Sequence, residues 1–160
     1  MNKFTLSWKM SLLVSLGLIF SAFSATFLLD EQTALLQQKL ITHYDQEQDG
    51  PEIKRYELNV TNSGFCRYKR FFNSGKVEYF SFNLVKFKGM DYVGDDKAGK
   101  LYLSTKGDDV IVQTYNDRKG GDVDSMAAAM IIPLKNIASQ DLADLNEGMV
   151  KVNALLLAQK

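Results

Sequence analysis

Few side chains in this chain are of the types that enzymes use as nucleophiles or bases. The sequence contains one histidine, His43, and one cysteine, Cys66. Nucleophilic catalysis needs a nucleophile close to a base, but a polar linker and a strand-like segment separate these two residues. A zinc site needs several His, Cys or carboxylate ligands at a recognisable spacing, which the sequence lacks. We therefore predict no catalytic residue, no cofactor and no metal ligand, and we interpret His43 as an incidental surface side chain.

The cysteine has two possible roles. Cys66 lies in the strand-like run Phe65-Cys66-Arg67-Tyr68-Lys69. A single cysteine can form an intermolecular disulfide or act as a reactive thiol. It can also serve as a small, half-buried hydrophobe in a strand. We favour the second interpretation.

Carboxylates cluster at three places, Asp95-Asp96, Asp108-Asp109 and Asp122-Val123-Asp124. Such oxygens could bind calcium, or serve as the acid and base of a hydrolase. However, each cluster follows a glycine at a strand junction, where aspartate favours turns, and none matches the calcium-loop pattern. We favour turns and keep a hydrolase or calcium-dependent enzyme as the alternative. Convergence of Asp95, Asp108 and Asp122 in space would support that alternative.

Basic and aromatic residues alternate in the segment 67–72, Arg-Tyr-Lys-Arg-Phe-Phe, as in some single-strand nucleic-acid platforms. The whole chain of 160 residues carries 19 basic and 19 acidic residues, whereas nucleic-acid binders usually show a basic excess. We therefore predict an amphipathic strand with solvated lysine and arginine side chains, and no nucleic-acid partner.

The first 25 residues have the organisation of a secretory signal peptide. Lys3 and Lys9 precede an uncharged run over 10–29, and small residues occupy most of 21–25. This order of basic, apolar and small residues predicts cleavage near Ser24 or Ala25 and an exported protein, periplasmic or secreted. The alternative is a retained anchor, since the run is just long enough to span a bilayer. The domain lies outside the cytosol in both cases, and contact with a membrane is expected only if the segment is retained.

The rest of the chain divides into a helix with its linker, 26–49, and a β-rich domain with a C-terminal helix, 50–160. The first helix is predicted by apolar residues at helical spacing, and Gly50-Pro51 ends its polar linker. Its apolar stripe comprises Leu28, Leu35, Leu36, Leu40 and Tyr44.

Alternating and apolar runs predict about six strands. We expect a break in the long run 77–88 near Leu84-Val85, where the apolar phase slips. The runs 100–105 and 110–115 are predicted to form a hairpin. The other predicted strands are 52–60, 65–72 and 126–134.

The tail pattern predicts a helix with Ser139 as its N-cap and Asp141 near its positive end. Its apolar stripe comprises Leu142, Leu145, Met149, Val152 and Leu156. The fold class is therefore α+β, a bent antiparallel sheet or small barrel covered by the C-terminal helix.

This succession of short strands, with 132–137 running into the helix at 141–145, resembles pleckstrin-homology-like domains. Similar short exported domains occur in bacteria of the Bacteroidota type. The resemblance implies a bent barrel capped by a helix over 52–160. It implies no phosphoinositide site, because the matching basic loop motif is missing, and the fold alone does not define a function. We expect an exported, non-enzymatic domain that binds a protein or small ligand or acts as a structural accessory. A membrane-anchored interaction module is a further alternative.

Overall fold

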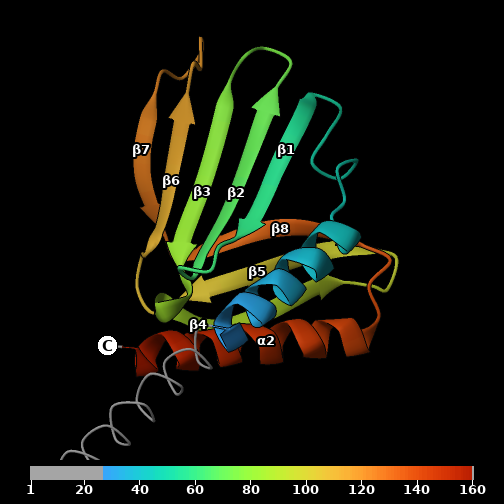
Figure 1. Ribbon diagram of the computed structural model, residues 1–160. Coiled ribbons are helices and arrows are strands. Elements are labelled where there is room, and N and C mark those ends of the chain that lie inside the picture. The colour runs from blue at the N-terminus through green and yellow to red at the C-terminus, as the bar shows by residue number, and fades with distance from the viewer. Residues whose placement is uncertain (1–26, 160) are drawn as a thin grey trace, which may run out of the picture.

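The chain builds two antiparallel sheets and passes between them three times (Figure 1). The computed structural model describes residues 27–159, starting with an N-terminal helix over 27–43. The elements that follow are β1 (Ile53–Val60), β2 (Phe65–Phe72), β3 (Val77–Asn83), the 3-10 helix η1 (Leu84–Lys86), β4 (Phe87–Gly94), β5 (Ala98–Thr105), β6 (Val110–Tyr115), β7 (Val123–Ala127), β8 (Ala129–Lys135) and α2 (Ser139–Ala158).

The larger sheet has the strand order β1-β2-β3-β6-β7, and the smaller one the order β4-β5-β8. The strand break that we expected near Leu84 lies where the chain first crosses from the larger sheet to the smaller one. There, η1 replaces a continuous strand, and the Asn83 side chain accepts a hydrogen bond of 2.9 Å from the Val85 N–H. In Figure 1 the strands of the smaller sheet cross below those of the larger one.

The predicted hairpin of 100–105 and 110–115 is wrong. Both segments are strands, β5 and β6, but β5 pairs with β4 and β8, whereas β6 pairs with β3 and β7. The reason lies in the corner between them. The Thr105 hydroxyl lies 2.6 Å from the Gly107 carbonyl oxygen and 3.0 Å from that of Ala128. These contacts hold the connection by which the chain crosses from β5 in the smaller sheet to β6 in the larger one.

Side chains alternate between the two faces of the larger sheet, and one of these faces lies in the core. Cys66 and Tyr68 lie opposite Phe82 and Phe80, so these four side chains share that inner face. All except the half-buried Phe80 are almost completely buried, and the smaller sheet contributes its own inner residues to the same core. This contribution comprises Leu101, Leu103, Met130, Ile132 and Leu134.

The predicted tail helix is confirmed in position, and most of its apolar stripe is buried. Leu145, Met149, Val152 and Leu156 are core residues, and Leu142 is partly buried. Its predicted cap is wrong, because Ser139 is the first helical residue and Ala138 precedes it without a side-chain cap bond. The helix lies beside β4, below the smaller sheet in Figure 1, and also contacts η1.

The N-terminal helix packs beside α2. Leu36 approaches Gly148 so closely that an added Cβ there would lie 2.7 Å from a Leu36 methyl carbon. Lys39 Nζ lies 2.7 Å from Asp141 and 2.9 Å from Asp144. These hydrogen bonds raise the pKa of Lys39. Leu35, which was predicted to belong to the apolar stripe, is 48% exposed. The buried face of the N-terminal helix is the one that carries Leu36 and Leu40.

The predicted α+β class, with antiparallel strands between two helices, is confirmed. The described residues contain eight strands instead of six, since the run 77–88 and the segment 123–135 each divide into two, and the sheets do not close into a barrel. The predicted signal peptide over 1–25 lies outside the described residues. Within 27–159, no helix combines the length and the apolar character needed to cross a bilayer.

Burial of the α2 stripe gives the first test. Leu145 is fully buried, so Leu145→Ala should lower the free energy of unfolding by about 2–5 kcal/mol. The matched control is Val150→Ala on the exposed side of the same helix, which should change it by less than about 0.5 kcal/mol. Urea unfolding measures both, and equal effects would contradict docking of α2 on the core.

Candidate functional site

The three aspartate clusters occupy separate turns. Asp95 accepts hydrogen bonds from the Lys97 and Ala98 N–H groups at 2.8 and 3.0 Å, in the turn before β5. Asp109 accepts one from the Gly107 N–H at 3.1 Å, in the turn after β5. The eight residues of β5 therefore separate these two clusters by roughly 26 Å.

The third cluster has a similar role in the loop between β6 and β7. Asp122 accepts a hydrogen bond of 2.7 Å from the Asn116 N–H. Across residues 27–159, no three His, Cys, Asp or Glu side chains are grouped as metal ligands would be. The geometry of the described chain thus gives no support to a calcium or hydrolase site built from these loops.

His43 and Cys66 lie apart and in different surroundings. His43 is partly exposed: its Nδ1 lies 3.3 Å from the Lys135 carbonyl oxygen and its Nε2 lies 3.9 Å from Asp141. Cys66 is completely buried rather than half-buried, 3.9 Å from the Met130 sulfur, and burial raises the pKa of its thiol to about 12. A thiol with such a pKa remains protonated near neutral pH and is a poor nucleophile.

The alternating run 67–72 divides its cations between the two faces of β2. Arg67 and Lys69 point outward with Phe71, and Lys69 Nζ lies 4.8 Å from the Phe71 ring centre. Arg70 points inward, so the prediction of solvated cations is wrong for this residue. Its guanidinium carbon lies 5.3 Å from the centre of the Phe80 ring.

Arg70 belongs to a half-buried polar network around Asp49. The Asp49 carboxylate, whose side chain is only 6% exposed, accepts hydrogen bonds from the hydroxyls of Tyr44 and Tyr68. It also accepts one from Arg70 at 2.8 Å. Residues from the end of the N-terminal helix, the linker and β2 are therefore joined at one carboxylate.

A second carboxylate extends this network toward the rim of the larger sheet. Arg70 also donates to Glu78 on β3 at 2.5 Å, and Lys76 donates to the other Glu78 oxygen at 2.7 Å. The Lys76 ammonium lies 4.1 Å from the centre of the Phe72 ring. We call the connected set Tyr44, Tyr68, Asp49, Arg70, Glu78 and Lys76 the Asp49 network.

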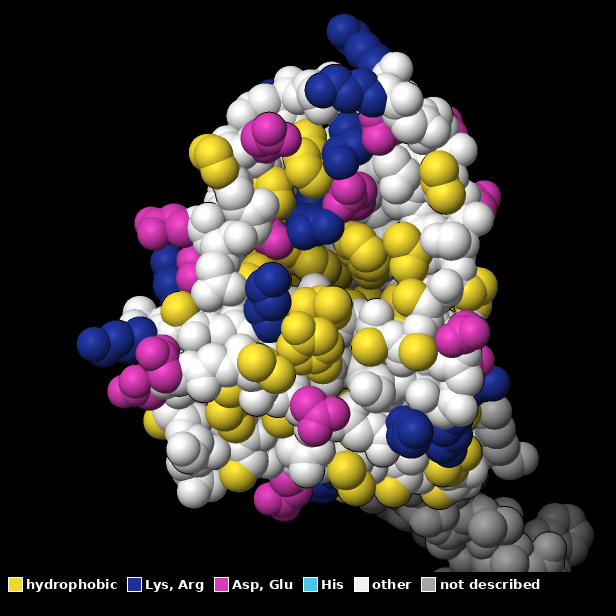
Figure 2. Space-filling view, turned by 180° about the vertical axis from the view of Figure 1, so that it is seen from behind, with side chains coloured by type: hydrophobic (Ala, Val, Ile, Leu, Met, Phe, Trp, Pro, Cys, Tyr) yellow, Lys and Arg dark blue, Asp and Glu magenta, His cyan; other side chains and the backbone are white. Residues whose placement is uncertain are grey.

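The Asp49 network ends at a pocket on the rim of the larger sheet. This rim pocket has a volume of about 650 Å³ and lies between the linker, the β2–β3 turn and the β6–β7 loop. Seen from behind, the molecule has a hollowed face where acidic, basic and hydrophobic side chains gather (Figure 2). The pocket is lined by Pro51, Glu52, Asn73, Ser74, Lys76, Asn116, Asp117, Arg118 and Lys119.

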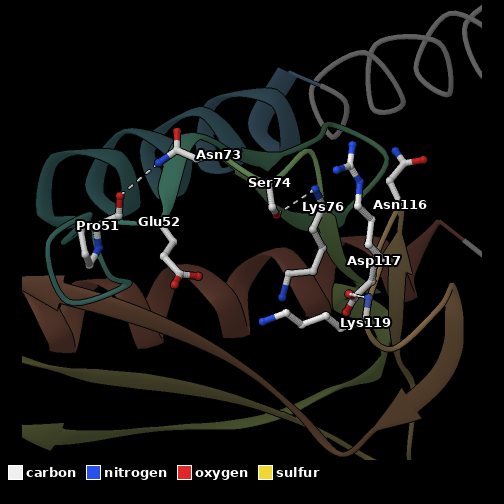
Figure 3. Close-up of a pocket in the computed structure, with 9 residues that line it drawn as sticks. Pro51, Glu52, Asn73, Ser74, Lys76, Asn116, Asp117 and Lys119 are labelled. Atoms are coloured by element: carbon white, nitrogen blue, oxygen red, sulfur yellow. Dashed lines mark hydrogen bonds between the residues drawn. The ribbon is translucent and has the colours of Figure 1, made fainter.

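Two ammonium groups extend into the rim pocket. Figure 3 shows that the side chains of Lys76 and Lys119 reach the same space, and that the Glu52 carboxylate faces it from the other side. The rest of the polar lining comprises two amides, a hydroxyl, a carboxylate and a guanidinium, from Asn73, Asn116, Ser74, Asp117 and Arg118. These groups can hold a polar molecule by hydrogen bonds and charge, but they include no activated nucleophile.

Local turn chemistry positions the basic side of this pocket. Asn116 adopts a left-handed φ of 57°, a conformation that asparagine tolerates better than most residues. Asp117 accepts a hydrogen bond of 2.9 Å from the Lys119 N–H, and this bond and one from Gly120 lower the pKa of Asp117. The Asp117 carboxylate is therefore ionised in the same pocket, where it attracts both Lys76 and Lys119.

Neither the rim pocket nor the Asp49 network is evident from the sequence. Asp49 lies in a polar linker of five such residues, 45–49, where no pattern distinguishes it from its neighbours. The available signal was Arg70, a cation at an inward position of a strand otherwise apolar on that side. A buried arginine needs a carboxylate partner, and this requirement could have prompted a search for one.

No protein-family model, curated protein or solved structure matches this chain. The resemblance to pleckstrin-homology-like domains therefore stays a prediction. Any functional assignment must come from the site itself.

The two tyrosines of the Asp49 network predict how stability depends on pH. Burial, followed by the hydrogen bond to Asp49, raises the pKa of both Tyr44 and Tyr68 above that of a free phenol. The folded state thus retains protons that the unfolded chain loses above about pH 10. We expect the free energy of unfolding to fall above that pH, by up to about 1.4 kcal/mol per pH unit for each tyrosine.

Urea unfolding between pH 8 and about 11.5 measures this slope. Tyr68→Phe should lower stability at pH 8, because Asp49 loses a donor, and should make the slope above pH 10 shallower. Tyr102→Phe on β5, outside the network, is the control and should leave the slope unchanged. An unchanged slope in Tyr68→Phe would contradict the assigned role of Tyr68.

Proposed function

We propose that this chain is an exported, non-enzymatic binding domain whose ligand site is the rim pocket. The observation that carries the proposal is the entry of Lys76 and Lys119 into one pocket of about 650 Å³ (Figure 3). A volume of this size suits a small molecule. The lining residues can bind such a molecule, and none of them is a histidine or a cysteine.

The charges of the pocket favour a ligand with an anionic group. Arg118 and Lys119 form no ion pair with the described residues, whereas Lys76 shares its charge with Glu78. Two cations that form no ion pair thus lie on one side beside the Asp117 carboxylate, and a carboxylate or phosphate would accept hydrogen bonds from them. Glu52 on the opposite side favours a donor group elsewhere on the same ligand.

The restrained position of the Lys76 side chain supports the rim pocket as the ligand site. Glu78 bonds both Arg70 and Lys76, and Arg70 in turn bonds the nearly buried Asp49. Lys76 is therefore held by a chain of charged hydrogen bonds that starts in the core. A lysine restrained in this way loses less side-chain entropy on binding than a free surface lysine.

Export of the domain rests on the predicted signal peptide. Intact mass of the protein recovered from outside the cytosol should lack about two dozen residues if the segment is cleaved. Full-length protein that stays in the membrane fraction after a carbonate wash would favour the anchored form. Protein found only in the cytosol would refute the proposed location.

Ligand binding is tested by amide chemical shifts in NMR titrations of the full chain. The probes are inorganic phosphate and succinate, with glycerol as an uncharged comparison. We expect either anion, but not glycerol, to shift the amides of 73–76 and 116–119. Lys119→Gln should weaken that binding by about tenfold or more, as expected for loss of a charged hydrogen bond.

Lys88→Gln is the matched control, because Lys88 is an exposed lysine on β4 and does not line the rim pocket. It should leave the affinity within about twofold of the original, since a distant exposed charge is screened. Shifts that spread over the surface, or equal losses in the two variants, would mean non-specific anion binding and refute the site.

A further inference from the structure

One wall of the rim pocket carries a carboxylate that is held in place but has no cation beside it. The Glu52 carbonyl accepts a hydrogen bond of 2.8 Å from the Asn73 N–H, and the Pro51 carbonyl accepts one of 3.4 Å from the Asn73 side chain. These bonds fix the backbone of this wall. Within residues 27–159, the exposed Glu52 carboxylate forms no ion pair.

The opposite wall has an excess of positive charge. Arg118 and Lys119 form no ion pair with the described residues, and Lys76 extends into the same space. Asp117 is the one carboxylate that lines this wall, so the three cations outnumber it. The Glu52 carboxylate faces them across the pocket (Figure 3). Charges of opposite sign therefore remain unpaired at two separate places in one cavity.

A ligand with charge of a single sign would satisfy only one of these walls. A simple anion would attract Lys119 and repel Glu52, and a simple cation would do the reverse. A molecule with an ammonium group at one end and a carboxylate at the other can form charged hydrogen bonds with both walls at once. The charge arrangement therefore favours a zwitterion whose two charged groups lie apart.

The rest of the lining suits peptide groups between those two ends. The Asn116 amide and the Ser74 hydroxyl can each donate and accept hydrogen bonds, and every peptide group offers one N–H donor and one carbonyl acceptor. Of the nine lining residues only Pro51 is apolar, so the pocket does not require an apolar ligand. Its volume of about 650 Å³ lies in the range that holds drug-sized ligands and exceeds the needs of a single amino acid.

We propose that the rim pocket binds a short peptide by its two charged ends, with the amino terminus at Glu52 and the carboxyl terminus at Arg118 and Lys119. This inference rests on the proposed function, in which the rim pocket is the ligand site. The contacts involve the ends and the peptide groups, so the pocket is expected to accept peptides of different sequence.

Three tripeptides of nearly equal size test this inference in NMR titrations of the full chain at pH 6.5. Trialanine then carries both charges, N-acetyl-trialanine only the carboxylate, and trialanine amide only the ammonium group. We expect trialanine to shift the amides of 73–76 and 116–119 and to bind about tenfold more tightly than either capped form, since each cap removes one charged hydrogen bond. Equal affinity for trialanine and either capped form would overturn the proposal.

Glu52→Gln tests which side chain binds the ammonium group. It should weaken the binding of trialanine about tenfold and should not weaken that of N-acetyl-trialanine. Glu31→Gln is the matched control, because Glu31 is an exposed glutamate on the N-terminal helix and does not line the pocket. It should leave all affinities within about twofold, since a distant exposed charge is screened. Equal losses of trialanine binding in the two variants would contradict the assigned role of Glu52.

The same titrations separate this inference from the proposed function. If succinate shifts the amides of 73–76 and 116–119 but trialanine binds no more tightly than its acetylated form, the rim pocket is an anion site and the peptide proposal is wrong. If neither succinate nor any of the tripeptides shifts these amides, the rim pocket is refuted as a ligand site, and the peptide proposal with it.

Discussion

The arrangement of this protein depends on one nearly buried carboxylate. Asp49 accepts hydrogen bonds from Tyr44, Tyr68 and Arg70, which lie at the end of the first helix and on β2. A carboxylate removed from water is stable only when such donors surround it. The linker after the first helix must therefore follow the path that delivers Asp49 to the sheet, and this path also forms one wall of the rim pocket.

The same charges connect the core to the surface. Arg70 shares its guanidinium between Asp49 and Glu78, while its Nε is buried without a hydrogen-bond partner among the described residues. The inner aromatic rings cover this arginine, so the ion pairs lie in surroundings of low polarity, where they are stronger than at the surface. Lys76, at the end of the network, is thus a restrained cation in an otherwise loop-built pocket.

Local patterns predicted most elements but not how the chain crosses between the two sheets. Phe65–Phe72 and Val110–Tyr115 were predicted with their observed bounds, because alternation and turn residues are local signals. The false hairpin of β5 and β6 shows the limit of such signals, because the Thr105 contacts that send β6 into the other sheet involve Ala128, far along the chain. The candidate site was missed for the same reason, since its residues come from three separate connections.

Hydrogen–deuterium exchange in Asp49→Asn tests most directly whether this carboxylate organises both regions. The substitution keeps the side-chain shape but removes the charge that Arg70 and the tyrosines contact. The account predicts faster exchange both at the end of the first helix, 44–50, and in the β2–β3 hairpin, 70–78, with little change in α2. Faster exchange confined to 44–50, with the hairpin as protected as in the unmodified chain, would contradict it.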